Sequence, residues 1–520
     1  MFIKKLKSAL ESGNTSRIKT VVKKLKAKQS TPEILLEACY CLLKDAAGFE
    51  KQALAFFEQG VALKPMYAEK ASSLVQELLG AENDELAEKI LMVGLQHAPD
   101  SVLINNELGL LYNRQEKYAA AEAVFLSILE KHDSRFEPLI NLSDLYFKMG
   151  RNHDAIACAQ LAVDVTPDAT LAYNNLGVIL MANARYKEAL HAFEKVLEVN
   201  PEHNDARISF GQLLLKSGLF DLGWQNLEYR WDHDQKINQM NLPLSTWNGE
   251  PLQGKGLIVW GDQGLGDSVM YAGLFKRLLA MGCRLNVICT RRMEKLFTDS
   301  FDLEKYYAHG NNETIQIAGK YNYEISFGSL PAMLLHSFDD FGDGGAYLKA
   351  DQTRVEQYNN ELRQLFPGKI LVGFTWRGGL SHTRKFARDT GLDVWQSMMG
   401  NPDYQFINLQ YDSADDDDNK IIEMGGYVTE LDCRNDIDGL AAMMKALDLV
   451  ISADNTTVHL AGALGVPVWT LLPFSSEWRW FFEEEKSYWY NSMRLFHQQK
   501  LNEWQACFDI VEKALVEEFS

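Results

Sequence analysis

Residues 451–469 read ISADNTTVHLAGALGVPVW. An apolar run ends at Asp454, small polar residues follow, and an Ala/Leu/Gly-rich stretch leads through Gly465 and Pro467 to a second apolar run. This order predicts a buried strand, a helix and another buried strand, because Gly and Pro end helices and short apolar runs are typical of strands in parallel sheets. The polar group at the strand-to-helix junction consists of Asp454, Asn455, Thr456 and Thr457.

The same alternation of strands and helices extends through the second half of the chain. The clearest apolar runs are GLIVW (256–260), CRLNVICT, KILVGFTW (369–376), YQFINLQ (404–410) and LVISAD. They predict α/β structure with doubly wound parallel sheets, in two Rossmann-like lobes over 256–360 and 361–500. A polar junction at 233–255 precedes the lobes, and an amphipathic helix at 501–520 follows them. Ligands of such sheets bind at the carboxyl ends of the strands.

The first half repeats at a period of 34 residues. Small residues recur at two phases and bulky apolar residues at a third: Ala53, Ala87, Ala121, Ala155, Ala189 and Gly223; Gly109, Ser143, Gly177 and Gly211; and Phe57, Leu91, Phe125, Phe193 and Leu227. Two helices pack closely only where the facing residues are small, so each unit is predicted to be a helix, a turn and a second helix. The pattern resembles the tetratricopeptide repeat over 32–232. We expect an α-solenoid, whose concave surface suits a protein or peptide.

Composition and charge narrow the function classes. A chain of 520 residues is expected to form several domains, and a net charge of −19 argues against a general nucleic-acid binder. Residues 1–31 are the exception, with nine Lys/Arg and a single acidic residue, Glu11, in 1–28. They predict a basic helix pair, whose charge is either a solvated face or a docking patch for an acidic partner or an anionic membrane surface. Scattered cysteines, and the lack of a signal-like or membrane-spanning stretch, favour free thiols and a cytoplasmic location.

The junction of Asp454, Asn455, Thr456 and Thr457 has two interpretations. The first N–H groups of a helix lack partners and carry partial positive charge, so this position is suited to a phosphate or diphosphate. His459 would lie in the first turn and face the same ligand. Asp, Asn and Thr are also good N-caps, and capping accounts well for one such residue but poorly for four in a row.

The stretch 451–480, together with DQGLGDS upstream, resembles the glycosyltransferase module that is fused to tetratricopeptide repeats in many bacterial proteins. That module is similar to the heptosyltransferases, which have the GT-B fold, and the Thr-Thr pair is similar to that of repeat-bearing O-linked N-acetylglucosamine transferases. The resemblance implies a GT-B arrangement of the two lobes. It also implies sugar transfer from a nucleotide-sugar used as a substrate, with no cofactor and no bound metal.

The resemblance places the donor in the C-terminal lobe. It assigns the donor phosphates to Asp454, Asn455, Thr456, Thr457 and His459, and a basic phosphate contact to Arg388, for which Arg384 and Lys385 are competing candidates. Thr375, Trp376 and Arg377 end the first strand of this lobe and are expected to face the cleft. Gln410 ends the next strand and is a candidate contact for the nucleoside.

In the N-terminal lobe the resemblance makes Asp267 the general base. A carboxylate within hydrogen-bond distance can take the proton of an acceptor hydroxyl as the new bond forms. Gly264 and Gly266 would allow close approach of the backbone to the sugar or phosphate. The alternative is that Asp267 is the N-cap of a helix starting at Ser268.

Two further segments carry chemistry-bearing side chains. In FSSEWRWF (474–481), the aromatic residues Trp478 and Trp480 with Arg479 either stack on the ligand or pack the joint between the lobes. The acidic run Asp415–Asp418 is expected to be a solvated loop. A C-terminal helix often crosses back to the first lobe in GT-B folds.

Three functions fit these features. The leading hypothesis is a glycosyltransferase that modifies Ser or Thr of an acceptor protein held by the repeats, with bacterial flagellins as a plausible acceptor by analogy. The second is a glycan or lipid-sugar transferase in which the repeats serve assembly. The third is a non-catalytic adaptor or chaperone with a relic nucleotide-binding module.

Overall fold

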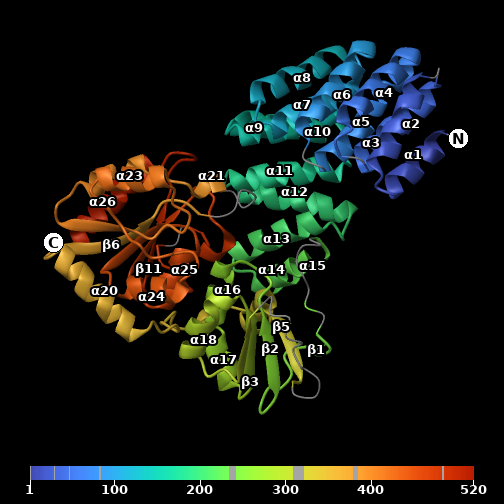
Figure 1. Ribbon diagram of the computed structural model, residues 1–520. Helices are drawn as coiled ribbons and strands as arrows, with labels where there is room; N and C mark the ends of the chain where they lie inside the picture. Colours follow the sequence, from blue (N-terminus) through green and yellow to red (C-terminus); the bar gives the residue numbers. More distant parts are fainter. Residues whose placement is uncertain are drawn as a thin grey trace. The chain divides into compact units, whose positions relative to one another are not determined.

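The computed structural model describes residues 2–27, 30–45, 47–80, 83–233, 240, 242–308, 321–378, 385–482 and 485–519. The chain divides into two compact units, Met1–Ile179 and Leu180–Ser520, with the boundary inside helix α11. Figure 1 shows that the first unit is helical, whereas the second contains helices followed by two α/β lobes.

Helix pairs follow one another along the first half, as the period of 34 residues predicts. Their bounds are α1 Phe2–Glu11, α2 Thr15–Ala27, α3 Pro32–Asp45, α4 Glu50–Leu63, α5 Lys70–Gly80, α6 Asp84–His97, α7 Val102–Arg114, α8 Tyr118–Lys131, α9 Phe136–Lys148, α10 Asn152–Val165, α11 Thr170–Ala182, α12 Tyr186–Val199, α13 Asn204–Lys216, α14 Phe220–Leu227 and α15 Arg230–His233. The solenoid part of the predicted fold is confirmed.

The small residues of the repeats lie at helix contacts. Ala53, Ala87 and Ala121 are fully buried. At Gly109, an added Cβ would lie 2.5 Å from Cε1 of Phe125, a distance that side chains do not tolerate. The glycine on one helix therefore makes room for the aromatic ring on its neighbour, which explains why both residue types recur at fixed phase.

The N-terminal lobe is built on a sheet with the strand order β1-β5-β2-β3-β4, in which paired strands are parallel. Its elements are β1 Ser245–Thr246, β2 Gly256–Trp260, α16 Leu265–Ala272, α17 Phe275–Ala280, β3 Arg284–Cys289, α18 Glu294–Ser300, β4 Lys305–Ala308, β5 Tyr323–Ser326 and α19 Leu330–Leu334. Helix α20, Gln352–Leu365, follows and packs on the C-terminal lobe, where its Arg354 pairs with Asp436 at 2.6 Å. The chain passes from β2 to β3 on one side and returns to β5 on the other. The loop after β2 is therefore at the switch point of the sheet, where ligands bind in this architecture.

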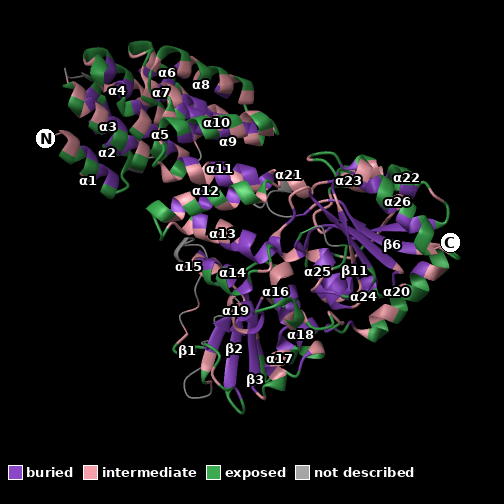
Figure 2. Cartoon of the chain, turned by 180° about the vertical axis from the view of Figure 1, so that it is seen from behind, coloured by how far each residue is buried: buried purple, intermediate pink, exposed green. Residues whose placement is uncertain are grey.

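The C-terminal lobe has the strand order β11-β10-β9-β6-β7-β8, again with paired strands parallel. Its elements are β6 Ile370–Thr375, α21 Lys385–Arg388, α22 Gln396–Met399, β7 Tyr404–Asn408, α23 Asp415–Glu423, β8 Tyr427–Val428, α24 Ile437–Lys445, β9 Leu449–Ala453, α25 Thr456–Ala463, β10 Val468–Leu472, β11 Met493–His497 and α26 Gln505–Phe519. The order reverses between β6 and β9. Figure 2 shows the strands of both lobes as buried, so these are sheets covered on their faces, as predicted for doubly wound folds.

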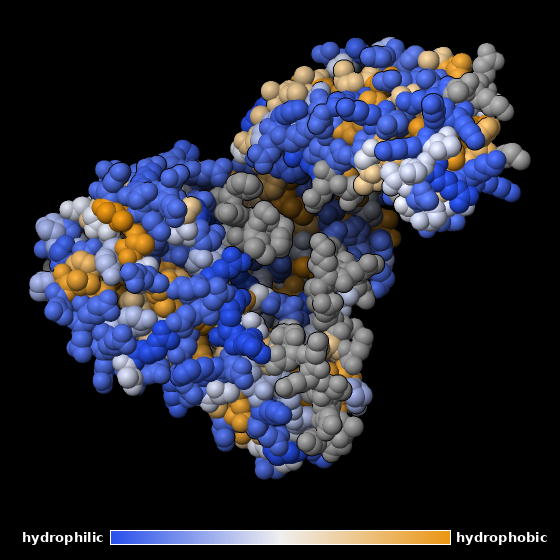
Figure 3. Space-filling view, in the orientation of Figure 1, coloured by the Kyte–Doolittle hydropathy of each residue, from blue (hydrophilic) through white to orange (hydrophobic). Residues whose placement is uncertain are grey.

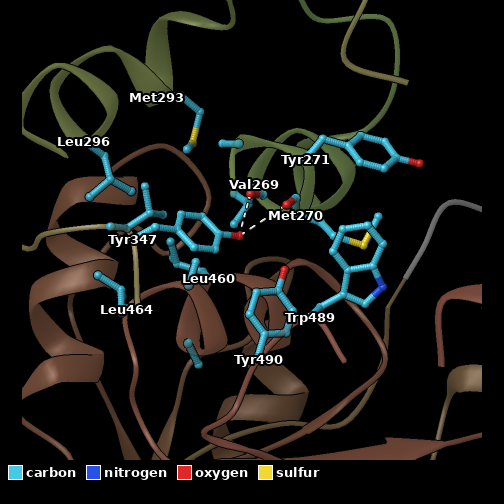
Figure 4. Close-up of a cluster of buried hydrophobic side chains, with 14 of the residues drawn as sticks. Val269, Met270, Tyr271, Met293, Leu296, Tyr347, Leu460, Leu464, Trp489 and Tyr490 are labelled. Atoms are coloured by element: carbon cyan, nitrogen blue, oxygen red, sulfur yellow. Dashed lines mark hydrogen bonds between the residues drawn. The ribbon is translucent and has the colours of Figure 1, made fainter. Parts of the chain in front are cut away.

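A cluster of buried side chains joins the two lobes within the second unit. Figure 4 shows Val269, Met270 and Tyr271 from α16 on one side of this cluster and Leu460 with Leu464 from the C-terminal lobe on the other. The hydroxyl of Tyr347 donates to the carbonyl oxygen of Val269 at 2.8 Å. This continuous core holds the start of α16 against α25 and confirms the expected facing arrangement of two lobes.

Two expectations about the C-terminal region are wrong. The acidic run Asp415–Asp418 is not a solvated loop but the first turn of α23, where negative charge is favourable beside the helix N-terminus. Helix α26 does not cross to the first lobe; Phe508 packs edge-on to Trp395 with ring centroids 4.9 Å apart, inside the core of the C-terminal lobe.

The surface is mostly hydrophilic on the face seen in Figure 3, with small apolar patches on both units. The lysines of α1 and α2 are exposed, and Lys7 pairs with Glu37 at 2.9 Å. None of the helices in the described ranges has the length and hydrophobicity of a membrane span. All seven cysteines lie in the described residues, and no disulfide joins them.

Candidate active site

A cavity of about 360 Å³ lies between the lobes, within the second unit, at the starts of α16 and α25. It brings together many of the predicted residues. Its lining consists of Gly264, Leu265, Gly266, Asp267, Arg388, Tyr411, Asp454, Asn455, Thr456, His459, Glu477 and Arg479. Residues of the Gly-rich loop and of the Asp-Asn-Thr-Thr junction thus share one cavity, although almost 200 positions separate them in the sequence.

A larger cavity of about 570 Å³ lies where α12 and α13 meet the C-terminal lobe. The ammonium group of Lys216 in its wall donates to the carbonyl oxygen and the hydroxyl of Ser476, at 2.9 and 2.8 Å. This lysine therefore ties the last repeats to the lobe. We place the candidate site in the smaller cavity, because that cavity lies at the strand ends and the helix starts where such folds bind ligands.

Asn455 is the N-cap of α25. Its Oδ1 accepts a hydrogen bond from the N–H of Thr457 at 2.8 Å, and its Nδ2 donates to Oγ1 of Thr375 at 2.8 Å and to the carbonyl oxygen of Arg377 at 2.9 Å. Both polar atoms of this side chain are therefore hydrogen-bonded, and they connect the end of β6 with the start of α25. The capping interpretation therefore accounts for Asn455. Thr456, which lines the cavity, is left as the junction residue placed to meet a ligand.

Asp454 lies in the cavity wall with only 1% of its surface exposed. Its Oδ2 has no hydrogen-bond partner. Burial raises the pKa of this carboxyl group, although the positive charges of Arg388 and Arg479 oppose the change. The indole N–H of Trp480 also favours the charged form of this carboxyl group, so Asp454 belongs to the buried wall of the cavity.

His459 lies in the first turn of α25 and lines the cavity, as predicted. Its Nδ1 is 3.0 Å from the hydroxyl of Tyr490, and its ring stacks on Trp480 with centroids 5.3 Å apart. Burial, together with the charges of Arg479 and Arg388, lowers the pKa of His459 well below its ordinary value of 6.5. The imidazole is therefore neutral at physiological pH, and it contributes hydrogen bonding rather than charge.

Asp267 is the third residue of α16, whose N-cap is Gly264. The alternative that Asp267 caps a helix starting at Ser268 is therefore wrong. Its Oδ1 accepts a hydrogen bond of 2.7 Å from Nη2 of Arg479, and 22% of its side chain is exposed. Burial alone would lower the pKa of Arg479, but the charges of Asp267, Glu477 and Asp454 outweigh burial and raise it, so the guanidinium keeps its proton.

Gly266 lines the cavity, and its Cα also lies close to the start of α25. An added Cβ would lie 3.1 Å from Cδ2 of His459 and 3.5 Å from Oγ1 of Thr456. The glycine thus lets the start of α16 approach α25, which is a packing role in place of the expected approach to a sugar or phosphate. At Gly264 the nearest atom to an added Cβ is Oδ2 of Asp267, at 3.3 Å.

Arg388 is the last residue of α21 and lines the cavity. Its Nη1 donates to the carbonyl oxygen of Asp454 at 3.4 Å, and its Nη2 is 4.0 Å from Oε1 of Glu477. Of the competing candidates, Arg384 lies outside the described residues, and the side chain of Lys385 does too.

The predicted residues at the end of β6 do not line the cavity. Trp376 is 2% exposed and packs with Phe374 in the core of the C-terminal lobe, so the expectation that it faces the cleft is wrong. The hydroxyl of Thr375 is buried within 2.6 Å of that of Ser452. Thr457 is buried as well. A side chain at a strand end can point either to the ligand or into the protein core. The side chains of Trp376 and Thr375 both point into the core.

Arg377 and Gln410 form a polar support behind the cavity. The side-chain oxygen of Gln410 accepts from the backbone N–H groups of Trp376 and Arg377, at 3.2 and 3.3 Å, and its amide donates to Asp412. Arg377 pairs with Asp412 and Asp417, at 3.3 and 3.1 Å. These residues hold the loop after β6 in place, which is a different role from the expected contact with donor or nucleoside.

Arg479, which the sequence placed either on the ligand or in the joint between the lobes, lines the cavity, together with Leu265, Tyr411 and Glu477, for which the sequence predicted no role. It lies in a short 3-10 turn, Trp478–Trp480, after β10. Trp478 packs edge-on to Trp224 with centroids 5.1 Å apart, which supports the packing interpretation for that residue. Within the described residues, no group of three or more His, Cys, Asp and Glu is arranged to hold a metal ion.

Comparison with known protein families supports the prediction of tetratricopeptide repeats in the helical half of the chain. Sequence profiles of the tetratricopeptide repeat match residues 136–168 and 170–203. The chain carries tetratricopeptide repeats. Two α/β lobes, each with a parallel sheet, follow them, and a cavity lies between the lobes.

One relative extends over both halves. Protein FlbA of Caulobacter vibrioides is 26% identical over 475 residues, which cover 80% of this chain and 79% of that protein. DnaJ homolog subfamily C member 3 of Bos taurus is 31% identical over 105 residues, covering 20% of this chain and 19% of that protein. Among solved structures, a glycosyl transferase of family 9 from Veillonella parvula covers 52% of this chain and 92% of its own, at 14% identity and a TM-score of 0.37. The tetratricopeptide repeat protein YrrB covers 35% of this chain and 93% of its own, at 20% identity and a TM-score of 0.27.

Proposed function

We propose that this protein is a glycosyltransferase that moves a sugar from a nucleotide-sugar to Ser or Thr of an acceptor protein held by the repeats. The observation that carries the proposal is the meeting of Asp267, from one lobe, with Thr456, Arg388 and Arg479, from the other, in one cavity. A carboxylate and a cluster of anion-binding groups on opposite sides of a cleft suit an acceptor hydroxyl and a donor diphosphate.

Each side of the cavity has a distinct role in this proposal. The start of α25 with Thr456 and the guanidinium of Arg388 hold the donor diphosphate. Asp267 takes the proton of the acceptor hydroxyl, whose oxygen then bonds to the anomeric carbon. The bond from that carbon to the diphosphate breaks, and its electron pair leaves with the diphosphate oxygen, where positive groups stabilise the charge. No resident cofactor takes part in this scheme, since the nucleotide-sugar is a substrate.

Intact-mass spectrometry of an acceptor protein tests the proposal. The purified protein is incubated with a panel of nucleotide-sugars and the flagellin of the same organism, the acceptor that the resemblance favours. We expect the mass of the flagellin to rise by one sugar, and Asp267→Asn to lose the transfer while it still binds nucleotide. Sugar found on a lipid or glycan would instead support the second hypothesis, and absence of any turnover would support the adaptor.

A further inference from the structure

The ion pair of Asp267 and Arg479 joins the two sides of the candidate site. Nη2 of Arg479 donates to Oδ1 of Asp267 at 2.7 Å, although 212 positions separate the residues. Only 13% of the Arg479 side chain and 22% of the Asp267 side chain are exposed. A charge-assisted hydrogen bond that is largely shielded from water is among the stronger polar contacts of a protein.

This contact opposes the role of Asp267 as a base. Oδ1 of Asp267 accepts the hydrogen bond from Arg479, so this oxygen cannot accept one from an acceptor hydroxyl. For as long as Arg479 keeps this partner, only Oδ2 of the carboxylate is available to an acceptor.

A diphosphate is the kind of ligand that can draw Arg479 away. The Nε of this guanidinium is buried and has no hydrogen-bond partner, so its N–H can still donate a hydrogen bond to a ligand. Arg388, Thr456 and Arg479 line the same cavity. A diphosphate bound to Arg388 and Thr456 would therefore be attracted by the positive charge of Arg479. Guanidinium groups bind phosphate oxygens in a bidentate manner, which a single contact to Oδ1 does not match.

We propose that Asp267 and Arg479 form a latch that the donor diphosphate opens, so that both carboxylate oxygens of Asp267 become available only after the donor is bound. This inference rests on the proposed function, and it makes Arg479 a positioning residue for Asp267. Binding of the donor before the acceptor is favoured by it, because the acceptor hydroxyl then meets a carboxylate with both oxygens available.

Calorimetric binding of inorganic pyrophosphate to the full chain tests the latch. Asp267→Asn removes the competing charge, so it is expected to bind pyrophosphate about tenfold more tightly than the wild type. Glu477→Gln is the matched control, because it removes the same charge from the same cavity without the 2.7 Å contact, and its gain is expected to be much smaller. The gain from Asp267→Asn should vanish when Arg479 is also changed to Ala or, if that variant does not fold, to Lys.

Three results would overturn the latch: equal affinity of the wild type and Asp267→Asn, an equal gain in Glu477→Gln, or a gain that persists without Arg479. Absence of pyrophosphate binding in every variant would overturn it as well. Failure of the proposed function has a different signature, namely no sugar on any acceptor, whatever the pyrophosphate affinities. The latch can therefore fail while transfer is observed, and the two results are distinguishable.

Discussion

The side-chain amide of Asn455 donates a hydrogen bond of 2.8 Å to the hydroxyl of Thr375. Both side chains are buried, and each lies at the end of a strand that flanks the switch point of the C-terminal sheet. The bond fixes the start of α25, and with it the direction of the N–H groups that the proposed donor site uses. The geometry of the candidate site therefore depends on Thr375, which does not line the cavity, as well as on Asn455, which does.

Replacing Asn455 with Ala is expected to destabilise the C-terminal lobe by about 2–3 kcal/mol. The change removes an N-cap and leaves the buried Thr375 hydroxyl and Arg377 carbonyl short of a donor. The urea midpoint of tryptophan fluorescence measures the loss. Thr375→Val removes one of the three Asn455 bonds and the contact with Ser452 but keeps the N-cap, so it is the matched variant and should lose less. An unchanged midpoint in Asn455→Ala would show that this network is not needed.

The two arginines near the end of β6 should respond differently to removal. Arg388→Ala takes a guanidinium from the cavity lining and is expected to weaken nucleotide binding by about tenfold or more, with little change in the melting temperature. Arg377→Ala breaks the pairs with Asp412 and Asp417 and should lower the melting temperature first. Calorimetry and thermal unfolding of both variants separate these effects. The reverse pattern would contradict the division into lining and support.

Gly266→Ala is expected to weaken nucleotide binding by about tenfold because α16 and α25 meet at this position. The new methyl group would lie 3.1 Å from Cδ2 of His459, so the imidazole must shift by a few tenths of an ångström within the cavity wall. Gly400→Ala is the control, since its nearest neighbour would be 3.4 Å away in ordinary contact and far from the cavity. If the two variants bind nucleotide equally well, Gly266 has no packing role in the site.

His459 predicts a specific dependence of stability on pH. Burial keeps its pKa well below 6.5 in the folded protein, whereas the unfolded chain binds a proton near pH 6.5. The unfolded state thus binds more protons below this pH, so the contribution of His459 to stability is present above about pH 7 and is lost as the pH falls.

Comparison with His459→Gln isolates this effect, because glutamine keeps a polar contact for Tyr490 but does not titrate. The difference in unfolding free energy between the two proteins should be flat above about pH 7. It should shrink by about 1.4 kcal/mol per pH unit below about pH 6. A constant difference from pH 5 to 8 would mean that His459 is not the buried neutral group described here.

The architecture could be predicted from the sequence because periodicity reflects packing. Ala and Gly recur in the repeats since helices touch there, and the apolar runs around Asp454 follow from strands buried on both faces. The edge strand β11 includes Arg494 and His497 among its five residues, so no apolar run in the sequence marks it. The charge of the acidic run at Asp415 favours a loop when it is taken alone, although a helix N-terminus accommodates that charge well.

The sequence could not predict which residues of the site line the cavity and which only support it. A polar residue at a strand-to-helix junction can cap the helix or meet a ligand, and only the direction of the side chain separates Asn455 from Thr456. Likewise, a strand end places Trp376 at the cleft without showing that its indole turns into the core. The pairing of Asp267 with Arg479 joins distant segments, and no local pattern in the sequence carries that information.

Calorimetric titration of UDP, CMP, ADP and GDP into the full-length protein tests the central claim most directly. Thr456→Ala, which changes the cavity lining, is compared with Thr457→Ala, whose side chain is buried beside it. We predict that one of the four nucleotides binds in the micromolar range, that Thr456→Ala weakens this binding, and that Thr457→Ala weakens it less. Absence of binding by all four nucleotides would contradict the assignment of a donor site at the start of α25.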